Sequence, residues 1–210
     1  MKHEIYIFGS MTRGEISSSS DADVLVIQDN SEPDSFPPSW SVYSRKTIEA
    51  YFAAGRLFAW HLHLEAVRVY PRSGSGFLAD LGEPAPYFSV AEDLADLRFL
   101  LENSLLELQN DSPSPIYELG LAYTAIRDIA MAASWSMLPK PSFSRYAPYE
   151  LPVRCPLPLA VYEIAMRARH ASTRGTAEPR DYDLAAKHLK ATPILEWAES
   201  VRSKTCPTHS

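Results

Sequence analysis

The chain has 210 residues, of which 46% are hydrophobic and 22% are charged, and its formal net charge is -6. These proportions are close to globular averages and exclude a fibrous or intrinsically disordered chain. The acidic balance argues against tight, non-specific binding of phosphate backbones, so nucleic acid is not indicated as a partner, although a local basic patch would still permit it.

Cysteine usage and hydropathy predict a cytoplasmic protein. Cys155 and Cys206 lie far apart and lack the spacing of a Cys/His metal site, which fits a reducing compartment. The segment Met1–Phe8 is a short apolar strand with Lys2, His3 and Glu4 in it, unlike a signal peptide. No run of about 18 apolar residues occurs, so the sequence predicts no membrane-spanning segment.

The first third of the sequence alternates between strand and helix patterns. Short apolar or β-branched runs predict strands, and apolar residues at helical spacing predict helices, with Gly55 as a break in the longest one. The expected elements are a strand at Glu4–Phe8, helical turns at Met11–Ile16, a strand at Asp23–Ile27, a strand at Trp40–Ser44, a helix at Lys46–Glu65 and a strand at Val67–Tyr70.

The rest of the sequence predicts helices only. Gly, Ser and Pro are frequent over Pro71–Tyr87, which indicates a boundary, so we expect a first domain at 1–72, a linker at 73–88, a helical domain at 89–203 and a tail at 204–210. Leu138–Pro158 contains many prolines, which predicts an ordered loop or short turns. The expected helices are Val90–Leu108, Ile116–Met137, Leu159–His170, Tyr182–Lys190 and Pro193–Arg202.

One short segment carries the chemistry. Gly9-Ser10 forms a turn into a helical segment, where unpaired backbone N–H groups and a hydroxyl can meet the phosphates of a nucleotide, and Arg13 can reach the same anion. Asp21 and Asp23 are two residues apart at the start of a strand, so both carboxylates point to one side. Such a pair suits Mg²⁺, which takes one or two protein carboxylates and phosphate oxygens.

These residues resemble a known family. The pattern Gly-Ser-x-x-Arg-Gly, followed by Ser-Asp-x-Asp and a hydrophobic strand, is similar to the nucleotidyltransferase superfamily of DNA polymerase β, in its minimal bacterial form. The resemblance implies an α+β fold, with a mixed sheet flanked by helices and followed by an all-helical domain. It also implies that Gly9 and Ser10 bind the triphosphate of an NTP, that Asp21 and Asp23 ligate Mg²⁺, and that a third carboxylate on a later strand activates the attacking hydroxyl.

The third carboxylate is not evident. Ser41 stands on the expected third strand where the resemblance places an aspartate. Glu65 is the remaining candidate, although its place in an apolar helical run favours a surface or capping role. The expected function is therefore a Mg²⁺-dependent nucleotidyltransferase that moves an NMP group to a hydroxyl of a small molecule, a protein or an RNA end. The alternative is a catalytically silent nucleotide-binding protein or an antitoxin-like regulatory partner of another protein.

Other polar and aromatic residues have plainer interpretations. His61 and His63 would share a face with Glu65 on a strand, as in some zinc sites, but the helix expected here separates them. Arg167, Arg169, His170 and Arg174 fit a helix C-terminus, with a phosphate or acceptor contact as the alternative. An RNA nuclease is disfavoured because Arg167 and Arg169 stand too close to His170 for the Arg-x4–6-His pair of helical ribonuclease domains. Aromatic residues in the proline-rich loop are expected to pack rather than stack on bases: Phe143, Tyr146 and Tyr149.

Overall fold

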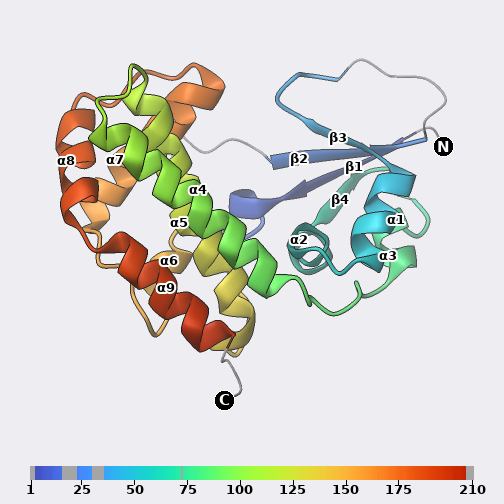
Figure 1. Ribbon diagram of the computed structural model, residues 1–210. Helices are drawn as coiled ribbons and strands as arrows, with labels where there is room; N and C mark the ends of the chain where they lie inside the picture. Colours follow the sequence, from blue (N-terminus) through green and yellow to red (C-terminus); the bar gives the residue numbers. More distant parts are fainter. Residues whose placement is uncertain (1–2, 16–22, 30–35, 72, 207–210) are drawn as a thin grey trace. The chain divides into compact units, whose positions relative to one another are not determined.

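The computed structural model describes residues 3–15, 23–29, 36–71 and 73–206. The chain divides into two compact units, Met1–Ser89 and Val90–Ser210. The first unit holds a sheet with helices, and the second is all-helical among its described residues, as the sequence predicts (Figure 1).

The sheet of the first unit is mixed and has the strand order β3-β2-β1-β4. The central strand β1 runs antiparallel to both β2 and β4, and β2 pairs with β3 in parallel. All four strands lie close to the segments where apolar runs predict them: β1 His3–Phe8, β2 Asp23–Gln28, β3 Ser41–Ser44 and β4 Val67–Tyr70.

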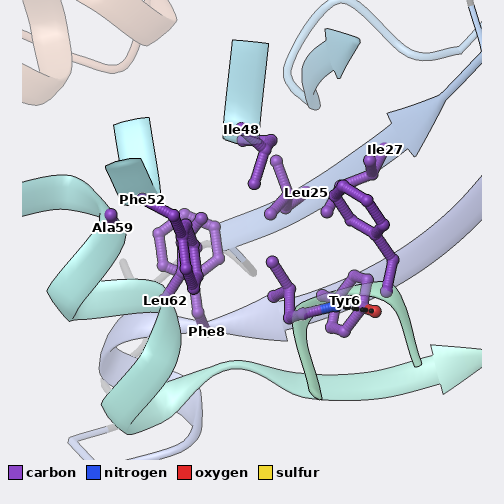
Figure 2. Packing of buried hydrophobic residues seen from close by; sticks show 10 residues of the cluster. Tyr6, Phe8, Leu25, Ile27, Ile48, Phe52, Ala59 and Leu62 are labelled. Atoms are coloured by element: carbon purple, nitrogen blue, oxygen red, sulfur yellow. Dashed lines mark hydrogen bonds between the residues drawn. The ribbon is translucent and has the colours of Figure 1, made fainter. Parts of the chain in front are cut away.

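One face of this sheet forms the core of the first unit with three helices, α1 Arg45–Ala53, α2 Leu57–Glu65 and α3 Phe77–Leu81. Alternate residues of β1 and β2 point to this face because side chains alternate along a strand. Full burial of one large apolar side chain stabilises the fold by about 1.5–3 kcal/mol. Figure 2 shows the strand and helix side chains of the cluster meeting: Tyr6, Phe8, Leu25, Ile27, Ile48, Phe52, Ala59 and Leu62.

The helix predicted over Lys46–Glu65 is broken at Gly55, as its glycine suggests. Gly55 has a φ of +60°, and a β-carbon there would stand 2.4 Å or less from the carbonyl oxygens of Ala85 and Pro86. Only glycine fits both this conformation and this close approach. The break separates α1 from α2 and lets both helices cover the same sheet face.

The segment at 73–88, where composition predicts a linker, is folded onto the first unit. It contains α3, whose Phe77 and Leu78 are buried in the core. The backbone N–H of Phe77 donates to the Glu4 carboxylate at 3.0 Å, and that of Leu78 donates to the Tyr6 hydroxyl at 3.3 Å. Side chains of β1 therefore hold the first turn of a helix whose glycine- and serine-rich surroundings conceal it in the sequence.

The turn after β1 also differs from its expected form. Helical turns are predicted at Met11–Ile16, but a 3-10 turn, η1, occupies Gly9–Met11, and Thr12–Gly14 continue as a turn. Ile16 lies outside the described residues. Gly9 has a φ of +73°, so the chain turns immediately at the end of β1 and does not first leave the strand for a separate helix.

The second unit contains α4 Val90–Gln109, α5 Pro115–Met137, α6 Ala147–Glu150, α7 Leu159–Arg174, α8 Tyr182–Ala191 and α9 Ile194–Thr205. The long helix α5 packs against both α4 and α7. Gly120 of α5 allows this approach, because a β-carbon there would stand 2.9 Å from the α-carbon of Arg169. None of the helices in the described ranges combines the length and apolar character needed to cross a membrane.

Two boundaries in this unit differ from the predicted ones. The helix expected to end at His170 continues to Arg174, and Gly175 ends it with a left-handed backbone at φ +65°. The proline-rich stretch Leu138–Pro158 consists of turns and loop as expected, except for the short helix α6.

Candidate functional site

The Gly-Ser turn is closed by hydrogen bonds to its own backbone. The carbonyl oxygen of Gly9 accepts from the backbone N–H groups of Thr12 at 3.1 Å and Arg13 at 3.3 Å, and from the Thr12 hydroxyl at 2.9 Å. The carbonyl of Ser10 accepts from the N–H of Glu15 at 2.9 Å. Gly9 and Ser10 are buried, so β1 ends in a buried turn that is closed by hydrogen bonds.

Asp23 begins β2 directly opposite Phe8, the last residue of β1. It points to the same face as Leu25 and Ile27, because residues two apart on a strand share a face. Its carboxylate lies against Gly9, since a β-carbon at Gly9 would stand 2.2 Å from its Oδ2 atom. The structure therefore brings together two of the predicted site residues, Gly9 and Asp23.

The described residues fit part of a Mg²⁺ site. The half-buried Asp23 provides one carboxylate at the edge of the Gly-Ser turn, and Asp21, the second predicted ligand, lies outside the described residues. Among the residues that the structure does describe, no group of three or more His, Cys, Asp or Glu side chains is placed to hold a metal ion. One or two carboxylates are what Mg²⁺ takes from a protein when phosphate oxygens supply further ligands.

The neighbouring strand contributes no further carboxylate. β3 runs parallel to β2, with Ser41 opposite Leu25 and Tyr43 opposite Ile27, and its sequence is Ser-Val-Tyr-Ser. The residue type expected to activate a hydroxyl is therefore missing from β3, the strand that pairs with the strand of Asp23.

Glu65 and Arg13, which sequence reasoning assigns to different roles, are ion-paired. Arg13 Nη1 donates to Glu65 Oε2 at 2.5 Å, and the same oxygen lies 2.9 Å from His61 Nε2. Arg13 also contacts Glu15 through Nε at 3.2 Å and through Nη2 at 3.3 Å. The guanidinium is thus flanked by one carboxylate from α2 and one from its own turn.

The two histidines of α2 do not form a joint site. His61 is half-buried and its ring packs edge-on against Phe8, with centroids 5.3 Å apart. His63 is exposed and packs against Trp60, with centroids 5.8 Å apart. Both lie on a helix, as expected, so the spacing that would have suited a strand-borne zinc site is lost.

The aromatic residues predicted to pack in the proline-rich loop do so. Phe143 is buried, and the Tyr149 hydroxyl donates to the carbonyl of Leu157 at 2.9 Å. The Tyr146 hydroxyl donates to Glu163 at 3.3 Å. Burial raises the pKa of Tyr149 above its ordinary value of 10, and the Cys155 and Glu163 charges act in the same direction. The basic residues noted in the sequence lie on the last turns of α7: Arg167, Arg169, His170 and Arg174.

Sequence reasoning missed the partners of Arg13. Glu15 is two residues away and carries no motif, while Glu65 is 52 residues away in sequence. A partial signal existed, because His61 and Glu65 are four residues apart on a predicted helix and so share a face.

Comparison with known proteins finds a family for the first part of the chain. The family model of the nucleotidyltransferase domain matches residues 2–72, which include the sheet, the Gly-Ser turn, both aspartates and Glu65. No curated protein matches the chain. The chain therefore contains, over residues 2–72, a nucleotidyltransferase domain of the polymerase β-like superfamily, and a helical region follows it.

Proposed function

We propose that the protein is a Mg²⁺-dependent nucleotidyltransferase that moves an NMP group from an NTP to a hydroxyl of a small molecule, a protein or an RNA end. Asp21 and Asp23 are the proposed metal ligands. Gly9, Ser10 and Arg13 are the proposed contacts of the triphosphate.

The contact between Gly9 and Asp23 carries this proposal. It joins the turn that would face phosphates to a carboxylate that would hold their metal ion, inside a domain matched by the nucleotidyltransferase family. Magnesium would offset the negative charge of the triphosphate and orient it for in-line displacement. Placing both functions within one contact limits the freedom of the bound nucleotide, which is the main catalytic contribution in such transfers.

The reaction forms one bond and breaks one. The acceptor hydroxyl oxygen attacks the α-phosphorus of the NTP, the bond from that phosphorus to the bridging oxygen breaks, and diphosphate leaves with the bonding electron pair. The hydroxyl loses its proton to solvent or to a nearby base. Arg13 would donate N–H groups to phosphate oxygens, which accept strong, charge-assisted hydrogen bonds.

A second candidate function follows from the missing carboxylate. β3 carries none, and Oε2 of Glu65 is already shared by Arg13 and His61. A site without a general base would bind a nucleotide and transfer slowly or not at all. The protein would then be a nucleotide-binding regulator, or an antitoxin-like partner of another protein.

Calorimetric titration of MgATP, MgGTP, MgCTP and MgUTP tests the nucleotide site. We expect the wild type to bind at least one of them and the Asp21→Ala, Asp23→Ala double variant to lose this binding. Asp96→Ala serves as the control, because Asp96 is exposed on α4 in the other unit. Equal metal-dependent binding by the wild type and the double variant would refute the proposed site.

Transfer of an α-³²P label from the bound NTP separates the two candidate functions. Labelling of an acceptor by the wild type, and loss of this labelling in the double variant, supports the nucleotidyltransferase. Nucleotide binding without transfer to small-molecule, protein or RNA acceptors, together with co-purification of a stoichiometric protein partner from the native host, supports the regulator.

A further inference from the structure

Arg13, His61 and Glu65 form a cluster that is more buried than a typical surface ion pair. The exposed fractions of the Arg13, His61 and Glu65 side chains are 19%, 17% and 14%. They come from two segments, the turn after β1 and the helix α2. His61 packs on Phe8, the residue that precedes Gly9, so the cluster is anchored beside the Gly-Ser turn.

Glu65 limits the conformations of Arg13. A free arginine side chain loses rotamer entropy when it is immobilised. The contact with Glu65 already restricts Arg13 in the folded domain, so the side chain loses less rotamer entropy when a ligand binds. Glu65 is itself restrained, because it is the last residue of α2 and its Oε2 also contacts His61.

Arg13 retains donors for a ligand. A guanidinium has five N–H groups. Nη1 donates to Glu65, and Nε and Nη2 contact Glu15, which leaves one N–H on each of Nη1 and Nη2 without an acceptor among the described residues. The Arg13 guanidinium can therefore keep its contacts with the carboxylates and donate its remaining N–H groups to phosphate oxygens.

We propose that Glu65 is a positioning residue of the nucleotide site: it holds Arg13 in the orientation that binds the triphosphate, and it is not the general base. The inference rests on the proposed function, since it assigns Arg13 the triphosphate as its ligand. It also explains why the carboxylate sits at the end of α2, next to the Gly-Ser turn, and is paired with a cation.

The direction in which Glu65→Gln changes the MgATP affinity tests this inference. Glu65→Gln removes a negative charge near the phosphates, so simple electrostatic competition predicts tighter MgATP binding. Positioning predicts binding about tenfold weaker. The same titration with Mg²⁺ and inorganic triphosphate should show the same loss, because the effect concerns the phosphates. Glu49→Gln is the matched control, since Glu49 is exposed on α1 and the charge change is identical.

A double-mutant cycle shows whether Glu65 affects nucleotide binding through Arg13. If Glu65 acts through Arg13, Glu65→Gln should weaken MgATP binding little further once Arg13→Ala is present. A purely structural role would lower the melting temperature of both variants and leave their effects on affinity independent. Independent effects, or a Glu65→Gln variant that binds as tightly as the wild type or tighter, would overturn the proposal.

Two further measurements distinguish failure of the role of Glu65 from failure of the proposed function. Glu65→Asp retains the charge but withdraws the carboxylate from Arg13, so it should also weaken binding, and wild-type affinity in this variant would count against positioning even if Glu65→Gln fails to fold. Absence of binding of all four magnesium-bound NTPs by the wild type would refute the proposed function itself. Binding that the Asp21→Ala, Asp23→Ala variant loses but the Glu65 variants retain would refute only the role of Glu65.

Discussion

The carboxylate of Asp23 lies against the α-carbon of Gly9, so that a β-carbon at Gly9 would stand 2.2 Å from the Oδ2 atom of Asp23. Gly9→Ala must therefore displace the carboxylate or the turn. We predict that MgATP affinity falls by at least about tenfold in this variant, because both proposed contacts of the nucleotide shift together. Titration calorimetry measures the loss.

Gly14→Ala is the control for backbone strain. Gly14 has the same φ of +73° as Gly9, but a β-carbon there would meet nothing within 4 Å. Both variants incur about 1–2 kcal/mol for a left-handed alanine, and only Gly9→Ala disturbs Asp23. Equal losses of MgATP binding in the two variants would show that the contact has no role in binding.

Gly55→Ala should destabilise the first unit. A β-carbon at Gly55 would approach the carbonyl oxygens of Pro86 at 2.3 Å and Ala85 at 2.4 Å, and backbone atoms cannot rotate away as a flexible side chain can. We predict that the free energy of unfolding falls by about 3 kcal/mol, from overpacking and from the left-handed backbone. Urea denaturation followed by tryptophan fluorescence measures it, because the Trp60 indole donates to the Ala85 carbonyl at 2.9 Å.

Gly175→Ala separates the two contributions to this loss. Gly175 has a left-handed backbone with φ +65° and ψ +24° and open space around its α-carbon, so only the backbone cost of about 1–2 kcal/mol applies. A loss as large as that of Gly55→Ala would attribute the whole effect to backbone conformation and none to packing against Ala85 and Pro86.

Local pattern was sufficient to predict most of the first unit. Leu25 and Ile27 belong to a run of apolar and β-branched residues, which is typical of a buried strand. The run alone therefore predicts the strand at Asp23–Ile27, and both residues are buried. Gly55 interrupts a helical pattern with a residue poorly suited to a helix interior, and the helix is interrupted there. The Gly-Ser turn and Asp23 are predicted as site residues because their residue types and spacing suit the proposed chemistry, and both lie within the matched domain.

Contacts between distant segments could not be read in the same way. α3 is short and lies among glycines and serines, and its place in the core depends on Glu4 and Tyr6, more than 70 residues earlier. The contact of Glu65 with Arg13, 52 residues away along the chain, has no signal in the sequence either. In both cases the deciding contact is a tertiary one, for which periodicity and spacing carry no signal.

Acid should destabilise the first unit through Glu4. The side chain is buried, and burial alone would raise its pKa, but hydrogen bonds from Tyr6 and from the Phe77 backbone, together with the charge of Arg45, hold the pKa below its ordinary value of 4.5. The unfolded chain therefore binds a proton more readily than the folded one. The stability that Glu4 contributes is present above the unfolded pKa and is lost as pH falls through the folded pKa.

Glu4→Gln tests this linkage. At neutral pH the variant should be less stable than the wild type by about 1–3 kcal/mol, because a charged acceptor of several hydrogen bonds is lost. The difference should shrink as pH is lowered from about 6 to about 3 in urea denaturations followed by tryptophan fluorescence. The exposed Glu49→Gln control should run parallel to the wild type. A constant difference between Glu4→Gln and the wild type would contradict the lowered pKa.

The two cysteines should differ sharply in reactivity. Burial raises the pKa of the Cys155 thiol to about 11, whereas Cys206 is only half-buried at the end of α9. At pH 8 only about one in a thousand Cys155 side chains would be the reactive thiolate, and access is restricted as well. With a disulfide reagent at pH 8 we expect one fast thiol and one slow thiol in the native protein, and two fast thiols in denaturant. Cys206→Ser should retain only the slow phase, and a fast native phase in that variant would show that Cys155 is accessible and ionised.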